Sequence, residues 1–240
     1  MELLVVTLAH TSPGKDAEGL ARVRMISDTV RNAPGLMNAR FYRSREPDSY
    51  YFLLTTWEDE KFWQKAQERY SPRNLLLAAD RKLLSAPPEQ WLMHYLWGYS
   101  RPSAQPDIAA AHVANIRSDQ ADRIERGWTE SLRRQALEPT LAFAFLARGS
   151  SEDAMRQNGS PTMSGNRNGS AMALQTYDTV FLNLLSWPGE THRQDFYADQ
   201  NYKAINTVLK SMGAVRVLAL DPFDTPAEGS AGTSSPTIPG

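Results

Sequence analysis

A short apolar stretch, "FLNLLSW" (181–187), carries two polar side chains that could do chemistry, the carboxamide of Asn183 and the indole of Trp187. Alternate residues of a strand share a face, so these two side chains are expected on one face together. A buried amide or indole N–H requires a hydrogen-bond partner. The pair could therefore hold a substrate oxygen or a peroxide. The alternatives are a bond from Asn183 to neighbouring backbone and plain core packing for Trp187.

A histidine, His112, stands in "IAAAHVAN" (108–115), a strand-like run of small residues. Small neighbours leave room beside the imidazole for a flat molecule. A neutral imidazole can accept a phenol proton near neutral pH, so His112 is a candidate general base. The alternative is a core histidine that neighbouring groups satisfy. His112, Asn183 and Trp187 are the predicted catalytic residues.

The tryptophan of "LSWPGETHRQDFYADQNY" (185–202) has a counterpart in "TTWEDEKFWQKAQERYSP" (55–72), where a tryptophan, a polar turn and an aromatic segment come in the same order. Such internal repetition indicates a duplicated unit. Residues 5–16 can be laid on 110–121 with a shift of 105, whereas Trp57 meets Trp187 with a shift of 130. The difference, 130 − 105 = 25, is the size of an insertion in the second copy.

Each copy has the element order β-α-β-β-α-β, which is the ferredoxin-like unit. The predicted domains are a first repeat at 1–100, a linker at 101–107, a second repeat at 108–223 with an inserted loop at 149–174, and a disordered tail at 224–240. A four-stranded sheet with helices on one face must cover its other face. Two such sheets packed together would do so, and one chain would then imitate a symmetric dimer.

Composition narrows the classes of function. Of the 240 residues 41% are hydrophobic, the formal net charge is −1 and there is no cysteine. The charge gives no reason to expect nucleic acid or a membrane as partner, and thiol chemistry is excluded. No apolar run approaches the ~20 residues of a membrane span, and "MELLVVTLAH" lacks the basic start of a signal peptide. A cytoplasmic protein is therefore expected. No P-loop, Rossmann, G-x-S-x-G or compact metal-ligand motif is found.

The segments "LLTTWEDEKFW" and "LNLLSWPGETH", within two β-α-β-β-α-β units, resemble the antibiotic biosynthesis monooxygenase superfamily of dimeric α+β barrels. The resemblance covers residues 1 to about 223. It implies an α+β fold in which two fused ferredoxin-like repeats form an intramolecular dimeric α+β barrel. The family includes cofactor-free oxygenases that convert anthrones to quinones, and haem-degrading relatives. A fused chain of this length resembles the ring-opening oxygenases of atypical angucycline pathways, of the jadomycin, gilvocarcin and kinamycin type.

The resemblance implies a metal-free oxygenase that converts a polycyclic aromatic polyketide to a quinone or cleaves its ring. O2 is the oxidant, and the electrons come from the substrate or from reduced flavin (FADH2 or FMNH2) as a co-substrate, with a flavin reductase as partner. A homodimer of the fused chain is a further expectation. The alternatives are a non-catalytic protein that binds aromatic ligands or haem, and a polyketide cyclase or isomerase.

Family pockets draw side chains from the aromatic helices, which adds further residues to the predicted site. The expected substrate-binding residues are Trp57, Tyr70, His192, Phe196, Tyr197 and Tyr202. For Phe196 the alternative is packing of its helix against the sheet, and for His192 it is exposure to water. Thr7 and Leu53 of the first copy match His112 and Asn183 of the second. We therefore predict that the second repeat holds the main active site.

Overall fold

The computed structural model describes residues 2–45, 49–79, 82–101, 108–138, 140–150 and 179–222. The first repeat consists of β1 (Leu3–His10), α1 (Asp16–Val30), β2 (Leu36–Ser44), β3 (Tyr50–Trp57), α2 (Glu60–Tyr70), α3 (Pro72–Leu77) and β4 (Glu89–Ser100). The second consists of β5 (Ile108–Ile116), α4 (Ser118–Leu137), β6 (Phe143–Ser150), β7 (Thr179–Trp187), α6 (Glu190–Ala198), α7 (Gln200–Met212) and β8 (Gly213–Pro222).

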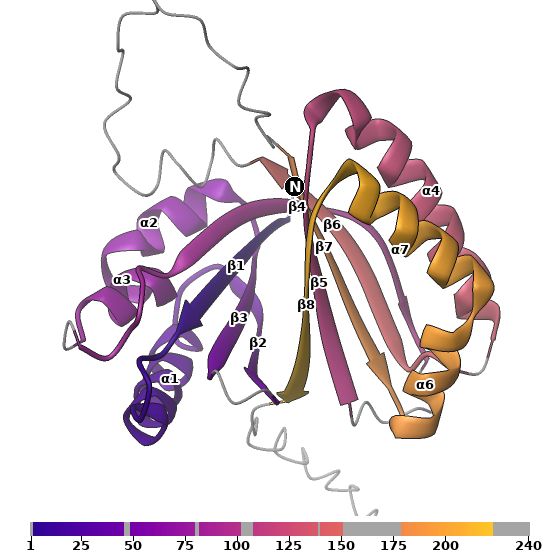
Figure 1. The fold of residues 1–240 in the computed structure, drawn as a ribbon. Coiled ribbons are helices and arrows are strands. Elements are labelled where there is room, and N and C mark those ends of the chain that lie inside the picture. The colour runs from indigo at the N-terminus through magenta and orange to yellow at the C-terminus, as the bar shows by residue number, and fades with distance from the viewer. Residues whose placement is uncertain are drawn as a thin grey trace, which may run out of the picture.

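The eight strands form one closed antiparallel barrel in the order β1-β3-β2-β8-β5-β7-β6-β4. Each repeat contributes four neighbouring strands, and the two sheets join where β2 pairs with β8 and β4 with β6. Helices α1, α2 and α3 cover the outside of one half, and α4, α6 and α7 cover the other (Figure 1). The predicted fold of two fused ferredoxin-like repeats in an α+β barrel is confirmed. Most of the predicted insertion and linker (151–174 and 102–107) and the tail (224–240) lie outside the described residues.

The strand registers show that the two repeats are equivalent position by position. Thr7 pairs with Leu53 between β1 and β3, and His112 pairs with Asn183 between β5 and β7. The shifts between these pairs, 112 − 7 = 105 and 183 − 53 = 130, are those read from the sequence. Residues at matching positions can therefore be compared directly.

The helix expected after the third strand is two helices in each repeat. In the first repeat Ser71 is extended and caps α3, whose first residue is Pro72. Proline cannot supply the backbone N–H that would continue α2, so the chain turns there. In the second repeat Asp199 separates α6 from α7, and its carboxylate accepts a hydrogen bond of 2.8 Å from the backbone N–H of Tyr202. The second turn brings residues of both helices over the same part of the sheet.

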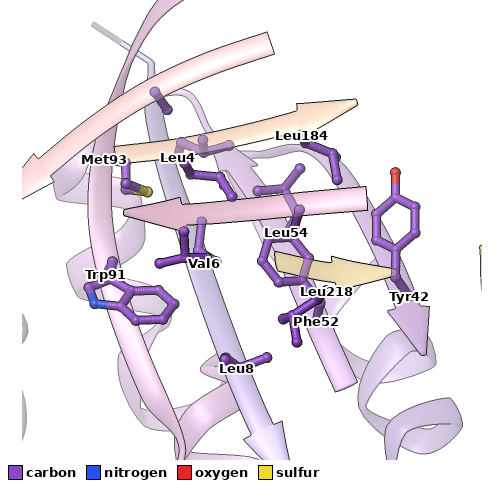
Figure 2. Close-up of a cluster of buried hydrophobic side chains, with 14 of the residues drawn as sticks. Leu4, Val6, Leu8, Tyr42, Phe52, Leu54, Trp91, Met93, Leu184 and Leu218 are labelled. Carbon is purple, nitrogen blue, oxygen red and sulfur yellow. The ribbon is translucent and has the colours of Figure 1, made fainter. Parts of the chain in front are cut away.

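The barrel wall separates two kinds of core. Inward-facing side chains such as Leu4, Leu54 and Leu218 pack together inside the barrel (Figure 2). Along β5, Ala111 and Val113 belong to this inner cluster, whereas Ala110 and Ala114 belong to a second cluster with α4, α6 and α7. By alternation His112 faces the helices. None of the helices that the structure describes is both long and apolar enough to span a bilayer.

Candidate active site

The imidazole of His112 lies between the second half of the barrel and its helices and is only 2% exposed. Its Nε2 atom is 3.2 Å from the hydroxyl oxygen of Tyr197 on α6 and 3.0 Å from that of Tyr202 on α7. The two phenol rings lie 5.0 Å apart, edge to face. Two tyrosines from different helices therefore converge on one imidazole nitrogen, which the turn at Asp199 makes geometrically feasible.

Burial sets the protonation states of these groups. Removal from water lowers the pKa of His112 to about 4, and an interaction with the backbone of Asn183 offsets this in part. Burial raises the pKa of Tyr197 to about 12, against a lowering by Arg193. The pKa of Tyr202 is raised as well, by burial and by the neighbouring Tyr197. At neutral pH the three groups form an uncharged network.

Two atoms of this region lack a hydrogen-bond partner in the described part of the chain, Nδ1 of His112 and Nε1 of Trp187. Both rings pack against Tyr197, with ring centroids 6.0 Å and 5.6 Å away. A buried polar group without a partner costs about 1–3 kcal/mol and is uncommon in native proteins. Helix α4 adds two more such atoms on its buried face, Oγ of Ser131 and Oε1 of Gln135.

The matching groups of the first repeat are satisfied. Nε1 of Trp57, the counterpart of Trp187, donates to Oγ1 of Thr55 at 3.0 Å. Thr7, the counterpart of His112, accepts a hydrogen bond of 3.0 Å from Nε2 of Gln90. Trp63 on α2 does leave its indole N–H without a partner among the described residues. At these two strand positions, therefore, the polar side chains of the first repeat have hydrogen-bond partners. In the second repeat Trp187 Nε1 and His112 Nδ1 have none among the described residues.

Asn183 is fully buried and bonds within the protein. In the amide orientation that suits both neighbours, Nδ2 donates to the carbonyl of Phe145 and Oδ1 accepts from Nε1 of Trp128, each at 3.1 Å. This is close to the alternative considered for Asn183, in which its amide bonds to backbone. Its expected role as a donor to peroxide remains a prediction, with one amide N–H left over.

Phe196 contacts Trp187 and also lines a surface hollow of about 440 Å³. Its ring packs 5.3 Å from the indole of Trp187 and 4.8 Å from Tyr202. Gln135 and Asp199 line the same hollow. Trp187 itself is fully buried and does not line this hollow.

The structure brings together six of the nine predicted site residues: His112, Asn183, Trp187, Phe196, Tyr197 and Tyr202. Trp57 and Tyr70 lie in a separate cluster between the first half of the barrel and α2. His192, on α6, is exposed to solvent.

Three residues of α4 were not anticipated for this site: Trp128, Ser131 and Gln135. Their spacing fits the buried stripe of the helix, which also contains Ile124 and Leu132. The available signal was the serine and glutamine on an otherwise apolar stripe, since such residues require partners when buried.

Comparison with known proteins adds a family and a set of similar folds. Residues 3–69 match the model of the family described as antibiotic biosynthesis monooxygenase. The match lies within the first repeat and covers less than half of the chain. No curated protein matches the sequence.

Several solved structures share the whole fold. An anthrone oxidase-like protein superposes with a TM-score of 0.65 at 11% identity, over 93% of this chain and 92% of that one. A candidate monooxygenase from Fusobacterium nucleatum subsp. nucleatum gives 0.64 at 8% identity, over 93% of both chains. One from Lactobacillus acidophilus gives 0.58 at 8% identity, over 92% of this chain and 93% of that one. At these identities the likeness establishes the fold alone.

Proposed function

We propose that the protein is an oxygenase that uses O2 to convert a phenolic polycyclic aromatic compound, of the anthrone or aromatic polyketide type, to a quinone in its second repeat. The observation that carries the proposal concerns two buried atoms, His112 Nδ1 and Trp187 Nε1, which have no hydrogen-bond partner among the described residues. Their counterparts in the first repeat are bonded. The family matched by residues 3–69 and the fold shared with an anthrone oxidase-like protein support the reaction class.

The proposed reaction balances without an added reductant. A ring methylene, CH2, and O2 give a ring carbonyl, C=O, and H2O. The methylene carbon loses a proton, and the resulting anion passes one electron to O2. The two radicals combine as a carbon-bound peroxide, which regains a proton. Loss of water, with the second methylene hydrogen, leaves the carbonyl. Because the substrate supplies all four electrons, the protein only has to orient it, exclude water and stabilise anions.

His112 is the group that we assign to proton transfer. If Nε2–H is bonded to a tyrosine oxygen, Nδ1 carries the free lone pair and can accept a proton. A pKa of about 4 makes the isolated imidazolium unfavourable. An adjacent substrate anion raises the pKa of the imidazole, because opposite charges stabilise each other in a dry site. The proton therefore moves to His112 only as the substrate anion forms beside it.

The indole N–H of Trp187 is the group that we assign to the developing peroxide. It is a donor without an acceptor in the described part of the chain, and it is shielded from water. A fixed donor of this kind stabilises charge that appears during the reaction more than charge already present, which is how oxyanion sites lower barriers. Phe196 packs against this indole and lines the surface hollow, so we assign substrate entry to a movement of Phe196.

The hollow beside Phe196 has the size of small-molecule pockets, which are usually about 300–1,000 Å³. Its rim carries three acidic side chains, Glu138, Asp195 and Asp199. The one arginine at the rim, Arg134, is 3.1 Å from the carboxylate of Glu130. A flavin phosphate would meet net negative charge there, so this entrance does not fit reduced flavin. We therefore assign the electrons to the substrate.

Oxygen uptake tests the proposal. We expect dithranol, a 1,8-dihydroxyanthrone, to be oxidised at pH 7 with one O2 consumed per quinone formed, above the enzyme-free rate and without flavin. His112→Phe removes the proton acceptor and should reduce the rate to background. Thr7→Val, the matched change in the first repeat, should leave the rate unchanged. Tight binding without oxygen uptake would indicate a ligand-binding protein instead, and an isomeric product without oxygen uptake would indicate a cyclase or isomerase.

A further inference from the structure

A second hollow, of about 350 Å³, opens at one end of the barrel, on the opposite side of the wall from the helices. Its floor includes Leu4 and Leu54, two members of the inner cluster (Figure 2). Its walls come from both repeats. Exposed apolar side chains border it, with Met37 53% and Tyr95 57% accessible to solvent. The mouths of β-barrels are common places for ligand sites.

One wall of this hollow is polar and the facing wall is aromatic. Asn38 and Arg40 precede Tyr42 on β2 at alternate positions, and Tyr42 belongs to the inner cluster, so all three face inward. The aromatic wall is formed by Phe143 and Phe145 of β6.

The two walls occupy equivalent strand positions. Phe41 pairs with Leu53 in the first repeat, and Leu146 pairs with Asn183 in the second. The shift of 146 − 41 = 105 therefore carries positions 38 and 40 of β2 onto positions 143 and 145 of β6. The repeats have diverged so that an amide and a guanidinium face two phenyl rings across one hollow.

The guanidinium of Arg40 is held over an aromatic ring. Its carbon lies 4.5 Å from the ring centroid of Phe143, and no carboxylate forms a salt bridge with it in the described part of the chain. Arg40 also interacts with the hydroxyl of Tyr42, whose pKa burial raises and Arg40 lowers. A guanidinium has five N–H donors, so donors remain for a ligand. Tyr95 stacks on Phe145 at 6.3 Å with an interplanar angle of 29°, which extends the aromatic wall.

We propose that this hollow binds a planar aromatic carboxylate. The rings would lie against Tyr95, Phe143 and Phe145, and the carboxylate would accept charge-assisted hydrogen bonds from Arg40. Glu2 also lines the hollow, and its carboxylate opposes a second anionic group on the ligand. The site therefore selects aromatic monoanions. It is separate from the helix-covered site of the second repeat and does not depend on the oxygenase proposal.

Binding of 2-naphthoate, measured by calorimetry, tests this site against its neutral isostere 2-naphthamide. We expect the wild-type protein to bind naphthoate about tenfold more tightly, because hydrogen bonds to charged groups are the stronger ones. Arg40→Gln should abolish that preference. The control Arg43→Gln changes an arginine of the same strand at an outward-facing position and should leave the preference intact. Glu2→Gln should tighten naphthoate binding and leave naphthamide binding unchanged.

Three outcomes would overturn the assignment. The first is absence of naphthoate binding at millimolar concentration. The second is equal affinity for naphthoate and naphthamide. The third is a preference that survives Arg40→Gln but is lost in Tyr197→Phe, which would place the ligand beside His112 instead. Failure of dithranol oxidation would leave this test unaffected, because no residue of the barrel mouth takes part in that reaction.

Discussion

The buried, neutral state of His112 makes a measurable prediction about stability at acid pH. Burial lowers the pKa of His112 to about 4 from its ordinary value of 6.5. Between these two values the unfolded chain holds a proton at this position that the folded chain does not. Protonation therefore favours unfolding, and the stability contributed by this group is complete above about pH 6.5 and falls as the pH approaches 4.

The size of the stability loss follows from how far burial lowers the pKa of His112. A difference of 2.5 pKa units corresponds to about 3 kcal/mol, since one unit is worth about 1.4 kcal/mol. Most of this loss, about 2–3 kcal/mol, should already be present at pH 4.5. Small domains are stable by only about 5–15 kcal/mol, so the effect should be plain in a denaturation curve.

Urea unfolding of wild-type protein and His112→Phe at pH 7.5 and 4.5 measures the effect. Many carboxylates also titrate in this range, but they are common to both proteins and cancel in the difference. We expect the wild type to lose about 2–3 kcal/mol more than the variant between the two pH values. His94→Gln, at an exposed position of β4, is the control and should behave as wild type. Equal losses in wild type and His112→Phe would show that the imidazole is not kept neutral, and the description of a dry site would fail.

Three further changes test the surroundings of His112 by urea unfolding at pH 7.5. Asn183→Leu should lower the free energy of unfolding by about 2–5 kcal/mol, because the Trp128 indole N–H and the Phe145 carbonyl lose their hydrogen-bond partner. A loss below about 1 kcal/mol would show that these two hydrogen bonds do not stabilise the fold. The double change Tyr197→Phe/Tyr202→Phe should cost more than the sum of the two single changes, because either hydroxyl alone can bond the imidazole Nε2; additive costs would contradict the shared role. Phe196→Ala should lower the free energy of unfolding by about 3–5 kcal/mol. It should also raise acrylamide quenching of tryptophan fluorescence, because it removes the ring that packs against Trp187; unchanged quenching would show that Phe196 does not shield this indole.

The repeat architecture could be predicted because its signals are local and occur twice. A tryptophan at a strand end, a polar turn and an aromatic helix recur with a fixed shift, and the registers of β1–β3 and β5–β7 follow from that shift. Strand alternation alone placed Asn183 and Trp187 on a common face. The break after Tyr70 was present in the sequence as Ser71 followed by proline, although a single helix was expected there.

The residues that form the site could be predicted only in part, because the packing of helices on the sheet determines which side chains meet there. Trp128 lies on α4, far from Asn183 in sequence, and only the packed helix brings its indole onto the amide. Trp57 and Tyr70 were expected in the site because they match the pattern of the second repeat. Closure of the barrel puts the helices of the two repeats on opposite sides, so these two residues form their own cluster (Figure 1).

Isotope labelling is the most direct test of the claim that the second repeat activates oxygen. The protein would oxidise dithranol under ¹⁸O2 without flavin, and mass spectrometry would measure how many ¹⁸O atoms the quinone contains. We predict one ¹⁸O atom in each quinone made by the wild type and by Thr7→Val, with product at background in His112→Phe. Quinone without ¹⁸O, or equal labelled product from Thr7→Val and His112→Phe, would contradict an oxygenase site in the second repeat.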